Sequence, residues 1–590
     1  KHVGEAALTE GDGGHAVGHV VRRDHEAREA QVQAGGELDG DGIGRRMHRP
    51  GQRGVRGQVE QLHRQKIIAR LVRGETARGN AADGITVNTV ADQNGTGADC
   101  SLREAIISAN TNTAFGGCAA GAPGLDTIVF NLPVFVQPTI NVGSTGAGPL
   151  PAIAEPVVID GSSAGRIELN GTSAGVAADG LKLSLFSGGS TLRSLVINRF
   201  GGTAIRLTDS SNNIIQNCYL GTDRNGSLAQ SNAQYGIHIS GGGSNVIGGA
   251  SASARNVISD GINLEDTSNN QVLGNYVGTD ASGTTALGNG SSVTVGGLST
   301  SSSNMIGGTT PEARNVISGN IGYGVYLTAA AIGNQVLGNY IGVSANGLTA
   351  LGNGAAGVLV EGGQNNQIGG TAVGAGNLIS GNAQSGIHVV SITGPITSGN
   401  RIEGNRIGVN ATGTAAIPNA TNGVSIQGAT NTTIGGTAAG AGNLISGNGT
   451  FGVYVRNQSG YAATGNRIEG NYIGTNAAGS AAIANGQDGV RIESGGNFVG
   501  GTTPQARNII SGNTQHGVFL TSELANDNQI QGNYIGTTAD GQFALGNGLD
   551  GIPIVSGANN LIGGSTAGFY TRLSAKATDY TAVTAPTFIA

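Results

Sequence analysis

One block of about 63 residues recurs through most of the chain, and this repeat constrains the fold more than any other feature of the sequence. Its anchor is an aliphatic residue followed by two glycines, and the anchors begin at Ile247, Ile306, Ile368, Ile434, Val499 and Ile562. Successive anchors are 59, 62, 66, 65 and 63 residues apart. Such regularity is typical of a solenoid, in which each unit packs only on its neighbours.

Each block contains three shorter units, each a strand pair with a Gly-Asn turn. In the block that begins at Ile306, these units end at Asn320, at Asn339 and at the next anchor. We therefore predict three coils of about 21 residues per block. The segment from 163 to 562 would then hold roughly 19 coils and extend on the order of 90 Å at ~4.8 Å per coil.

Aliphatic residues alternate with variable residues inside the predicted strands, which assigns the constant aliphatics to the interior and the variable positions to water. In the motif Gly-[Val/Ile]-x-[Leu/Val/Ile], position x is occupied by Tyr326, His388, Tyr454 and Phe519. We predict that these rings form a widely spaced row that contacts sugars or another protein. The alternative is that they only satisfy the β-propensity of an exposed strand.

No segment between these strands has the pattern of a long amphipathic helix, which excludes leucine-rich and ankyrin-type repeats. The chain of 590 residues has 107 Gly, no Trp and only 12% charged residues, so a core of large side chains is not available. A parallel β-helix needs only a thin interior of Val, Ile and Leu. Gly and Asn suit its corners, where stacked Asn side chains can form amide ladders.

A solenoid end needs a cap, and residues just ahead of the repeats are suited to one. The run Cys100-Ser101-Leu102-Arg103-Glu104-Ala105 contains a capping box, because Ser101 precedes Glu104 by three residues. The helix that follows has an apolar stripe made of Leu102, Ala105, Ile106 and Ala109. We expect it to lie across the first coil.

This run resembles the CSLREA domain, whose motif it matches at every position from Cys100 to Ala105. The segments 126–130 and 157–161 are similar to the strands that follow in that family, and the repeated block resembles those of bacterial surface proteins. The resemblance covers about 85–565. It implies export and an all-β fold: a right-handed parallel β-helix (solenoid) with a short helical N-terminal cap. It assigns no catalytic residues.

Four regions follow from these patterns. We expect a disordered or non-native leader in 1–80, with a small domain as the alternative, and a CSLREA-type cap with the first strands in 81–145. The β-helix repeats occupy 146–564, and 565–590 form an irregular tail. The chain starts at Lys1 and shows no signal peptide. We therefore expect a fragment of a longer protein.

The chain has three cysteines, of which Cys100 and Cys118 bracket the predicted helix. We predict a disulfide between them, which would place the protein outside the cytosol. Two buried free thiols are the alternative. Cys218 lies inside a repeat whose other copies have no cysteine at that position.

The net charge is −6, and the basic residues are concentrated near the start. Residues 1–80 hold 14 of the 31 Lys and Arg, which leaves 17 basic and 26 acidic residues for 81–590. This balance disfavours nucleic-acid binding, since nothing in the repeats would neutralise a row of phosphates. No run of 18 apolar residues is present, so the sequence predicts no membrane span.

Acidic residues are too dispersed to predict a catalytic pair. Glu403 and Glu469 are one block apart, hence about three coils or ~14 Å on the predicted division, and Asp488 and Asp550 are similarly separated. The best candidate for a cluster of charged catalytic residues consists of Asp160, Glu168, Asp179, Arg193, Arg199, Arg206 and Asp209. The alternative is that these residues are ordinary solvated surface. The Asp-containing loops 221–226 and 278–283 favour turn formation over Ca²⁺ binding.

We therefore expect an exported structural or adhesive surface protein that binds glycans or a partner protein along one face. We expect no catalytic residue, metal or cofactor, and no nucleic-acid partner. The alternative is a carbohydrate-active enzyme, a polysaccharide lyase or glycoside hydrolase, on a pectate-lyase-like β-helix. Either protein would be secreted or would lie on a bacterial cell surface.

Overall fold

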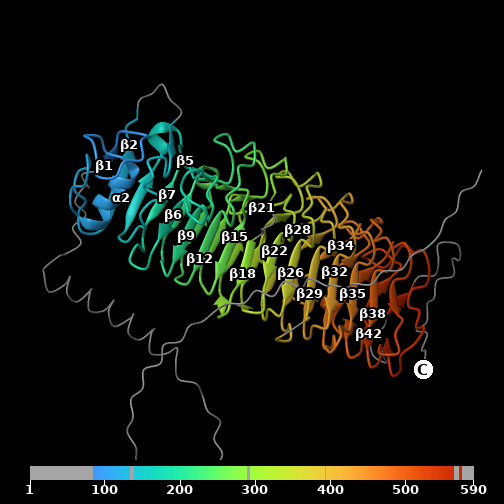
Figure 1. The fold of residues 1–590 in the computed structure, drawn as a ribbon. Coiled ribbons are helices and arrows are strands. Elements are labelled where there is room, and N and C mark those ends of the chain that lie inside the picture. The colour runs from blue at the N-terminus through green and yellow to red at the C-terminus, as the bar shows by residue number, and fades with distance from the viewer. Residues whose placement is uncertain (1–83, 133–137, 289–292, 393, 564–570, 574–590) are drawn as a thin grey trace, which may run out of the picture. The chain divides into compact units, whose positions relative to one another are not determined.

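The computed structural model describes residues 84–132, 138–288, 293–392, 394–563 and 571–573. Within the unit Gly79–Ala590, these residues form three long parallel sheets, one short strand pair and one α-helix. The chain visits the three sheets in turn, so that each strand pairs with strands of the preceding and following coils (Figure 1). The predicted all-β parallel β-helix with a short helical cap is confirmed.

The first sheet has sixteen strands: β1 (Ile85–Val87), β2 (Asp126–Phe130), β4 (Val157–Asp160), β7 (Thr191–Arg193), β10 (Ile214–Gln216), β13 (Val246–Gly248), β16 (Gln271–Leu273), β20 (Met305–Gly307), β24 (Gln335–Leu337), β27 (Gln367–Gly369), β30 (Arg401–Glu403), β33 (Thr433–Gly435), β36 (Arg467–Glu469), β39 (Phe498–Gly500), β42 (Gln529–Gln531) and β44 (Leu561–Ile562). The second sheet has fifteen strands: β3 (Thr139–Asn141), β5 (Ile167–Asn170), β8 (Leu195–Asn198), β11 (Tyr219–Leu220), β14 (Val257–Ile258), β17 (Tyr276–Val277), β21 (Val316–Ile317), β25 (Tyr340–Ile341), β28 (Leu378–Ile379), β31 (Arg406–Ile407), β34 (Leu444–Ile445), β37 (Tyr472–Ile473), β40 (Ile509–Ile510), β43 (Tyr534–Ile535) and β45 (Arg572–Leu573).

The third sheet has twelve strands: β6 (Leu181–Leu183), β9 (Ile205–Thr208), β12 (Ile237–Ser240), β15 (Ile262–Glu265), β18 (Val293–Gly296), β22 (Val325–Leu327), β26 (Val358–Glu361), β29 (Ile387–Val390), β32 (Val424–Gln427), β35 (Val453–Arg456), β38 (Val490–Glu493) and β41 (Val518–Leu520). The short pair is β19 (Ser301–Ser302) with β23 (Ala331–Ile332), and three 3-10 turns are η1 (Ser162–Ala164), η2 (Ala252–Ala254) and η3 (Pro504–Ala506).

One coil takes about 32 residues, not 21, so the predicted division of the block is wrong. Ile306 pairs with Val336 and Val336 pairs with Ile368, which gives coils of 30 and 32 residues. The block therefore contains two coils, and thirteen first-sheet strands follow residue 163 rather than roughly 19. Each predicted unit held two strands, whereas a coil with three faces needs three.

Aliphatic residues stack inside the helix in register from coil to coil. Ile306, Val336 and Ile368 are fully buried members of one such column in the first sheet. The interior thus contains mainly Val, Ile and Leu, as the alternating pattern predicts. Their burial, worth roughly 25 cal/mol per Å² of apolar surface, drives the stacking of coils.

Asparagine ladders, which the sequence indicated as suited to the corners, run along three of them. In each ladder the side-chain Nδ2 donates to the Oδ1 of the next Asn, as Asn339 does to Asn377 at 3.1 Å. The same Nδ2 also donates to a main-chain carbonyl, here Ile306 at 2.8 Å, which satisfies both amide protons. The three ladders contain residues 213, 245, 270, 304, 334, 366, 400, 466, 497, 528 and 560; residues 256, 275, 315, 339, 377, 405, 443, 471, 508 and 533; and residues 320, 353, 382, 419, 448, 485, 513 and 547.

Cys218 precedes Asn256, the first residue of the second ladder, on the adjacent coil. The equivalent positions of later coils hold the Asn residues of this ladder, and so they have no cysteine. The main-chain N–H of Cys218 donates to Asn256 Oδ1 at 2.8 Å. The thiol is free and fully buried, and this burial raises its pKa to about 12. Cys218 is therefore an unreactive packing residue.

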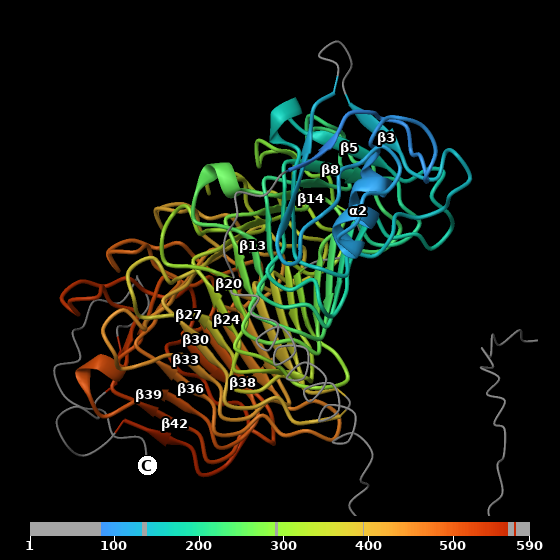
Figure 2. The same ribbon diagram turned by 90° about the vertical axis from the view of Figure 1, so that its left-hand side faces the viewer.

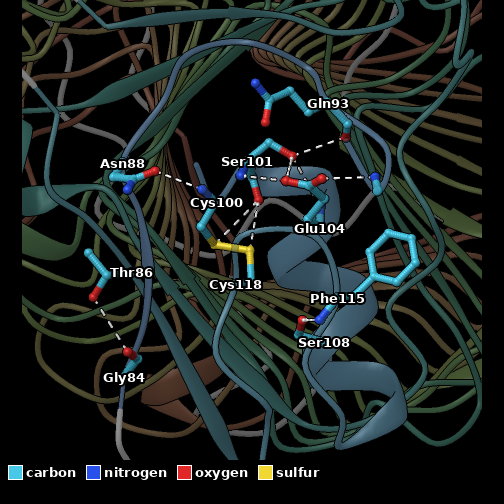
Figure 3. Close-up of a disulfide and its surroundings, with 11 residues drawn as sticks. Gly84, Thr86, Asn88, Gln93, Cys100, Ser101, Glu104, Ser108, Phe115 and Cys118 are labelled. Atoms are coloured by element: carbon cyan, nitrogen blue, oxygen red, sulfur yellow. Dashed lines mark hydrogen bonds between the residues drawn. A yellow bond between two sulfur atoms is a disulfide. The ribbon is translucent and has the colours of Figure 1, made fainter. Parts of the chain in front are cut away.

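Helix α2 (Leu102–Thr111) packs against β1 and β2 at the start of the β-helix. Ser101 and Glu104 form the predicted capping box, and the structure joins Cys100 and Cys118 in a disulfide beside it (Figure 3). The helix has non-helical backbone at Ser101, whose hydroxyl accepts from Glu104 N at 3.3 Å. The disulfide and the helix start are thus one structural unit.

The other residues of the cap motif also have structural partners. Leu102 and Ala105 are buried in the core. Arg103 forms a buried ion pair with Asp92 at 2.7 Å and donates to the carbonyls of Gly148 and Pro149. Every residue of the motif is therefore committed to holding the cap.

Loops that project from every second coil cover the outer side of the second sheet. Ala345 N donates to Gly283 O at 2.9 Å, and Ala411 N donates to Gly347 O at 3.0 Å, so the loops are bonded to one another. Leu378 on the sheet packs under them. The loops cover only part of the second sheet, because Tyr340 and Tyr472 are half-buried and Arg406 is exposed.

Candidate functional site

The structure places the predicted row of rings in one column of the third sheet: Tyr326, His388, Tyr454 and Phe519. Leu359, Ser425 and Arg491 occupy the positions between them. Successive rings are thus two coils apart, or about 10 Å at ~4.8 Å per coil. Figure 1 shows strands β22, β29 and β35 of this column on one face. We call these seven residues the aromatic column.

The column is only partly open to water, which differs from the predicted outward face. Its four rings are half-buried, while Leu359 is 4% exposed and Ser425 is fully buried. Side chains of neighbouring coils cover the smaller members. A ligand would therefore meet the rings and not a continuous open strand surface.

Three column rings pack against a second ring that lies three residues earlier in the chain. The centroid distances are 5.5 Å for Tyr323 and Tyr326, 5.1 Å for Phe451 and Tyr454, and 4.8 Å for His516 and Phe519. These partner rings were not among the residues predicted from the sequence. A four-residue sequence pattern identifies them: a ring residue, Gly, Val and a second ring residue occur in this order at all three places.

Carboxylates of the next coil hold two of the tyrosines. The Tyr326 hydroxyl donates to Glu361 and the Tyr454 hydroxyl donates to Glu493, both at 2.7 Å. Burial and the adjacent carboxylate raise the pKa of Tyr326, and in the same way raise that of Tyr454 to about 12. Both rings are therefore neutral and fixed in orientation.

His388 is the imidazole of the column. Burial, and then the Arg456 charge, lower its pKa to about 4, although Gln427 partly opposes this shift. His388 is consequently neutral at pH 7 and acts as a polar ring rather than as a cation.

Arg491 lies between two rings in the last coils of the column. Its guanidinium is 5.0 Å from the Phe451 ring centroid and 5.3 Å from that of Phe519. Its Nε donates to Glu493 at 2.8 Å. Rings, a guanidinium and a carboxylate are thus concentrated on β35, β38 and β41.

Asp488, His516 and Asp550 precede a glycine on three successive coils. His516 N donates to Asp488 Oδ1 at 3.1 Å, and His516 Nδ1 lies 3.7 Å from an Asp550 carboxylate oxygen. The two aspartates are thus two coils apart rather than the predicted three, and they lie on opposite sides of His516. Burial raises the pKa of Asp488, whose side chain is not exposed, whereas the Asp550 side chain is 77% exposed.

Glu403 and Glu469 lie in one column of the first sheet, two coils apart and not three. At ~4.8 Å per coil their separation is about 10 Å, just beyond the ~6.5–9.5 Å of an inverting pair of carboxylates. They are also buried rather than facing water, with 2% and 9% exposure. Each accepts from the arginine of its own strand, Arg401 or Arg467, and not from a shared ligand group.

A cleft of about 250 Å³ opens beside Glu469. It lies over the neighbouring first-sheet strands β36, β39 and β42, which Figure 2 shows side by side. Its lining includes Arg467, Glu469, Phe498, Thr503, Gln529 and Gln531. This cleft could not be predicted from the sequence, because its walls come from four successive coils.

The early cluster of charges is not one site. Arg193 pairs with Asp160 on the first sheet at 2.7 Å. Arg199 lies 3.7 Å from Glu168 beside the second sheet, and Arg206 pairs with Asp179 beside the third at 2.7 Å. Asp209 follows β9 on the third sheet. The interpretation of these residues as a cluster is wrong, because neighbours in sequence face three directions.

One part of that region does extend into a network. Arg206 Nη1 lies 2.5 Å from His238 Nδ1, and His238 Nε2 lies 2.7 Å from Glu265. Because arginine can only donate, Nδ1 accepts and Nε2 donates to the carboxylate. Burial lowers the pKa of His238, so this chain of side chains holds a neutral imidazole.

The aspartate loops have the predicted turn-forming role. Asp223 Oδ1 accepts from the main-chain N–H groups of Ser227 and Leu228, at 2.7 and 3.0 Å. Asp280 bonds Thr284 and Thr285 in the same way. Although partial burial opposes it, this bonding lowers the pKa of both carboxyls. In the described part of the chain, no group of His, Cys, Asp and Glu is arranged to hold a metal ion.

The described residues also contain no helix long and apolar enough to cross a membrane. No protein-family model and no curated protein matches the chain. The fold and its disulfide-bonded start define the class: a capped parallel β-helix.

Solved structures are similar to this chain in fold alone. The periplasmic alginate epimerase AlgG is 13% identical with a TM-score of 0.31, over 70% of this chain and 76% of that chain. The A-module of the Azotobacter vinelandii mannuronan C-5 epimerase AlgE4 is 14% identical with a TM-score of 0.32, over 75% and 91%. Tailspike protein 3 of bacteriophage CBA120 is 12% identical with a TM-score of 0.36, over 76% and 61%.

Proposed function

We propose that the protein is an exported structural or adhesive β-helix protein of the CSLREA type, which binds glycans through the aromatic column. The observation that carries this proposal is the repeated arrangement of paired rings with a carboxylate on the next coil. Rings offer apolar faces to sugar C–H groups, and carboxylates accept hydrogen bonds from sugar hydroxyls. The two-coil spacing would let an extended chain contact several rings.

Two further observations support export and a structural role. The Cys100–Cys118 disulfide fits an oxidising compartment outside the cytosol. The cap motif and the Asn ladders serve to hold the backbone and not to bind a ligand. On the described third sheet, the aromatic column holds the largest set of rings available for contact with a ligand. A surface rod needs this kind of uniform scaffold.

The test is to incubate the purified full chain with pectin, alginate and neutral polysaccharides. We expect retention on one or more of these glycans and no release of unsaturated or reducing-end products. Replacing Tyr326 and Tyr454 together with Ala should strongly reduce retention, while replacing both with Phe should preserve most of it. Undiminished binding by the Ala variant would contradict the role of the column.

A carbohydrate-active enzyme is the second candidate, favoured by one observation. The exposed Asp550 carboxylate lies 3.7 Å from His516 Nδ1, and a carboxylate beside an imidazole can serve in general acid–base catalysis. Clear turnover in this incubation, lost in Asp550→Asn, would establish this function instead of adhesion.

A further inference from the structure

The cleft on the first sheet is separate from the aromatic column. It lies over β36, β39 and β42, whereas the column follows the third sheet. Glu469 and Gln531 extend from β36 and β42, and Gly500 of the strand between them has no side chain. The space above that glycine, closed on one side by Thr503 of the following loop, forms the cleft.

The aromatic wall of the cleft is specific to these coils. Phe498 occupies a position that holds Met305, Gln367 and Thr433 in the equivalent coils of earlier blocks. The two residues that continue the wall on the next coil are Gln529 and Gln531. The repeated scaffold therefore carries one locally differentiated site.

The charges in the cleft balance one another. Arg467 donates to Glu469 Oε1 at 2.9 Å, and its guanidinium lies 4.4 Å from the Phe498 ring centroid. The arginine is thus held by a carboxylate and a ring. A polyanionic ligand would need an excess of positive charge, which this lining does not have.

The polar groups that remain are those that bind hydroxyls. Among the described residues, Glu469 Oε2 has no protein donor, and Gln531 Nε2 bonds Gly563 O while its Oε1 stays free to accept. The Gln529 amide and the Thr503 hydroxyl add both donors and acceptors. Phe498 supplies the apolar surface that small-molecule sites combine with a few such groups.

From this balance of groups we infer that the cleft binds a neutral sugar residue. The volume of about 250 Å³ lies just below the ~300 Å³ lower end of common ligand sites, which suits one ring of a glycan rather than a long segment. This inference extends the proposed glycan binding to a second face and names its ligand class. The cleft would contact a single sugar ring of a neutral glycan chain, whereas the aromatic column would contact such a chain at several points.

The experiment is isothermal titration of the full chain with neutral oligosaccharides (cello-, malto- and laminari-series) and with uronate oligosaccharides of similar length. We expect saturable binding of a neutral series and none of the uronates. Phe498→Gln, which installs the residue found at position 367, should weaken binding at least tenfold. Glu469→Gln should do the same while still accepting a bond from Arg467.

The matched control is Glu403→Gln, which alters the equivalent carboxylate two coils earlier and should leave the affinity unchanged. The Ala variant of Tyr326 and Tyr454 should also keep oligosaccharide binding in the titration. Glycan binding by the column and sugar binding by the cleft are therefore tested by different variants, and either hypothesis can fail without the other. Preference for uronates, no neutral binding, or equal affinity in Glu469→Gln would each overturn the inference. Circular dichroism of each variant verifies that the fold is retained.

Discussion

The hydroxyl of Tyr454 donates a 2.7 Å hydrogen bond to Glu493 on the following coil. We predict that Tyr454→Phe lowers the free energy of unfolding by about 1 kcal/mol, since a bond to a charged but partly exposed group is lost. Chemical denaturation followed by circular dichroism measures this change. Tyr461→Phe is the control, because its hydroxyl only reaches the exposed Gly394 carbonyl at 3.2 Å, and an equal loss there would contradict the prediction.

Thr432 interrupts the first Asn ladder between Asn400 and Asn466. Its side chain is fully buried, and its hydroxyl has no hydrogen-bond partner among the described residues. Thr432→Asn would restore the missing rung, so we predict a gain of about 1 kcal/mol in unfolding free energy.

The opposite substitution tests the same ladder. Asn466→Thr removes the acceptor that Thr432 N uses and a donor to Asn497, and should cost about 1–3 kcal/mol. The denaturation midpoints of the two variants should therefore move in opposite directions. A shift of both in the same direction would show that the rungs do not act as proposed.

Acid should destabilise the fold through His388. Its folded pKa of about 4 lies below its ordinary value of about 6.5, so the unfolded chain binds more protons between these two values. The stability contribution is present above pH 6.5 and is lost as the pH falls towards 4, by roughly 1–3 kcal/mol. We predict that His388→Gln loses less stability between pH 7.5 and 4.5 than the unmodified chain.

Thermal midpoints at the two pH values give the measurement. His238→Gln provides a comparison, because the pKa of His238 is also lowered by burial and its loss should flatten the same pH dependence. An identical pH dependence in all three proteins would contradict the role of both imidazoles.

Counting reactive thiols tests both the Cys100–Cys118 disulfide and the burial of Cys218. We predict no reaction of the native protein with a thiol reagent, one thiol after unfolding and three after unfolding with reduction, because Cys218 is buried and Cys100 is joined to Cys118. Cys118→Ala should lower the stability of the cap by about 2–4 kcal/mol. Two additional reactive thiols in the unreduced protein would contradict the disulfide.

Much of the fold follows from the sequence because the repeat fixes both strand spacing and face. The buried column of Ile306, Val336 and Ile368 is the one that the alternating pattern indicates. The number of residues in one coil could not be predicted from the alternating pattern. A two-residue strand such as β21 carries no alternation of its own, so the third face of each coil was not counted.

The candidate sites were predictable only in part, for a related reason. Tyr326 and Tyr454 occupy equivalent places in the repeat, so their alignment follows from periodicity. Their contacts with Glu361 and Glu493 depend on the register between coils, and that register depends on loop lengths that vary along the chain. The cleft at Phe498 is formed by four successive coils, so no single repeat unit indicates it.

The loops over the second sheet are bonded to loops two coils away, as Ala411 is to Gly347. Removing or adding a single coil would set a loop against a coil that has none, and would bring two glycine-bearing or two long-side-chain strands together on the first sheet. Gene duplication or protein engineering should therefore lengthen and shorten this scaffold in steps of two coils. A two-coil deletion should fold, whereas a one-coil deletion of half that size should not.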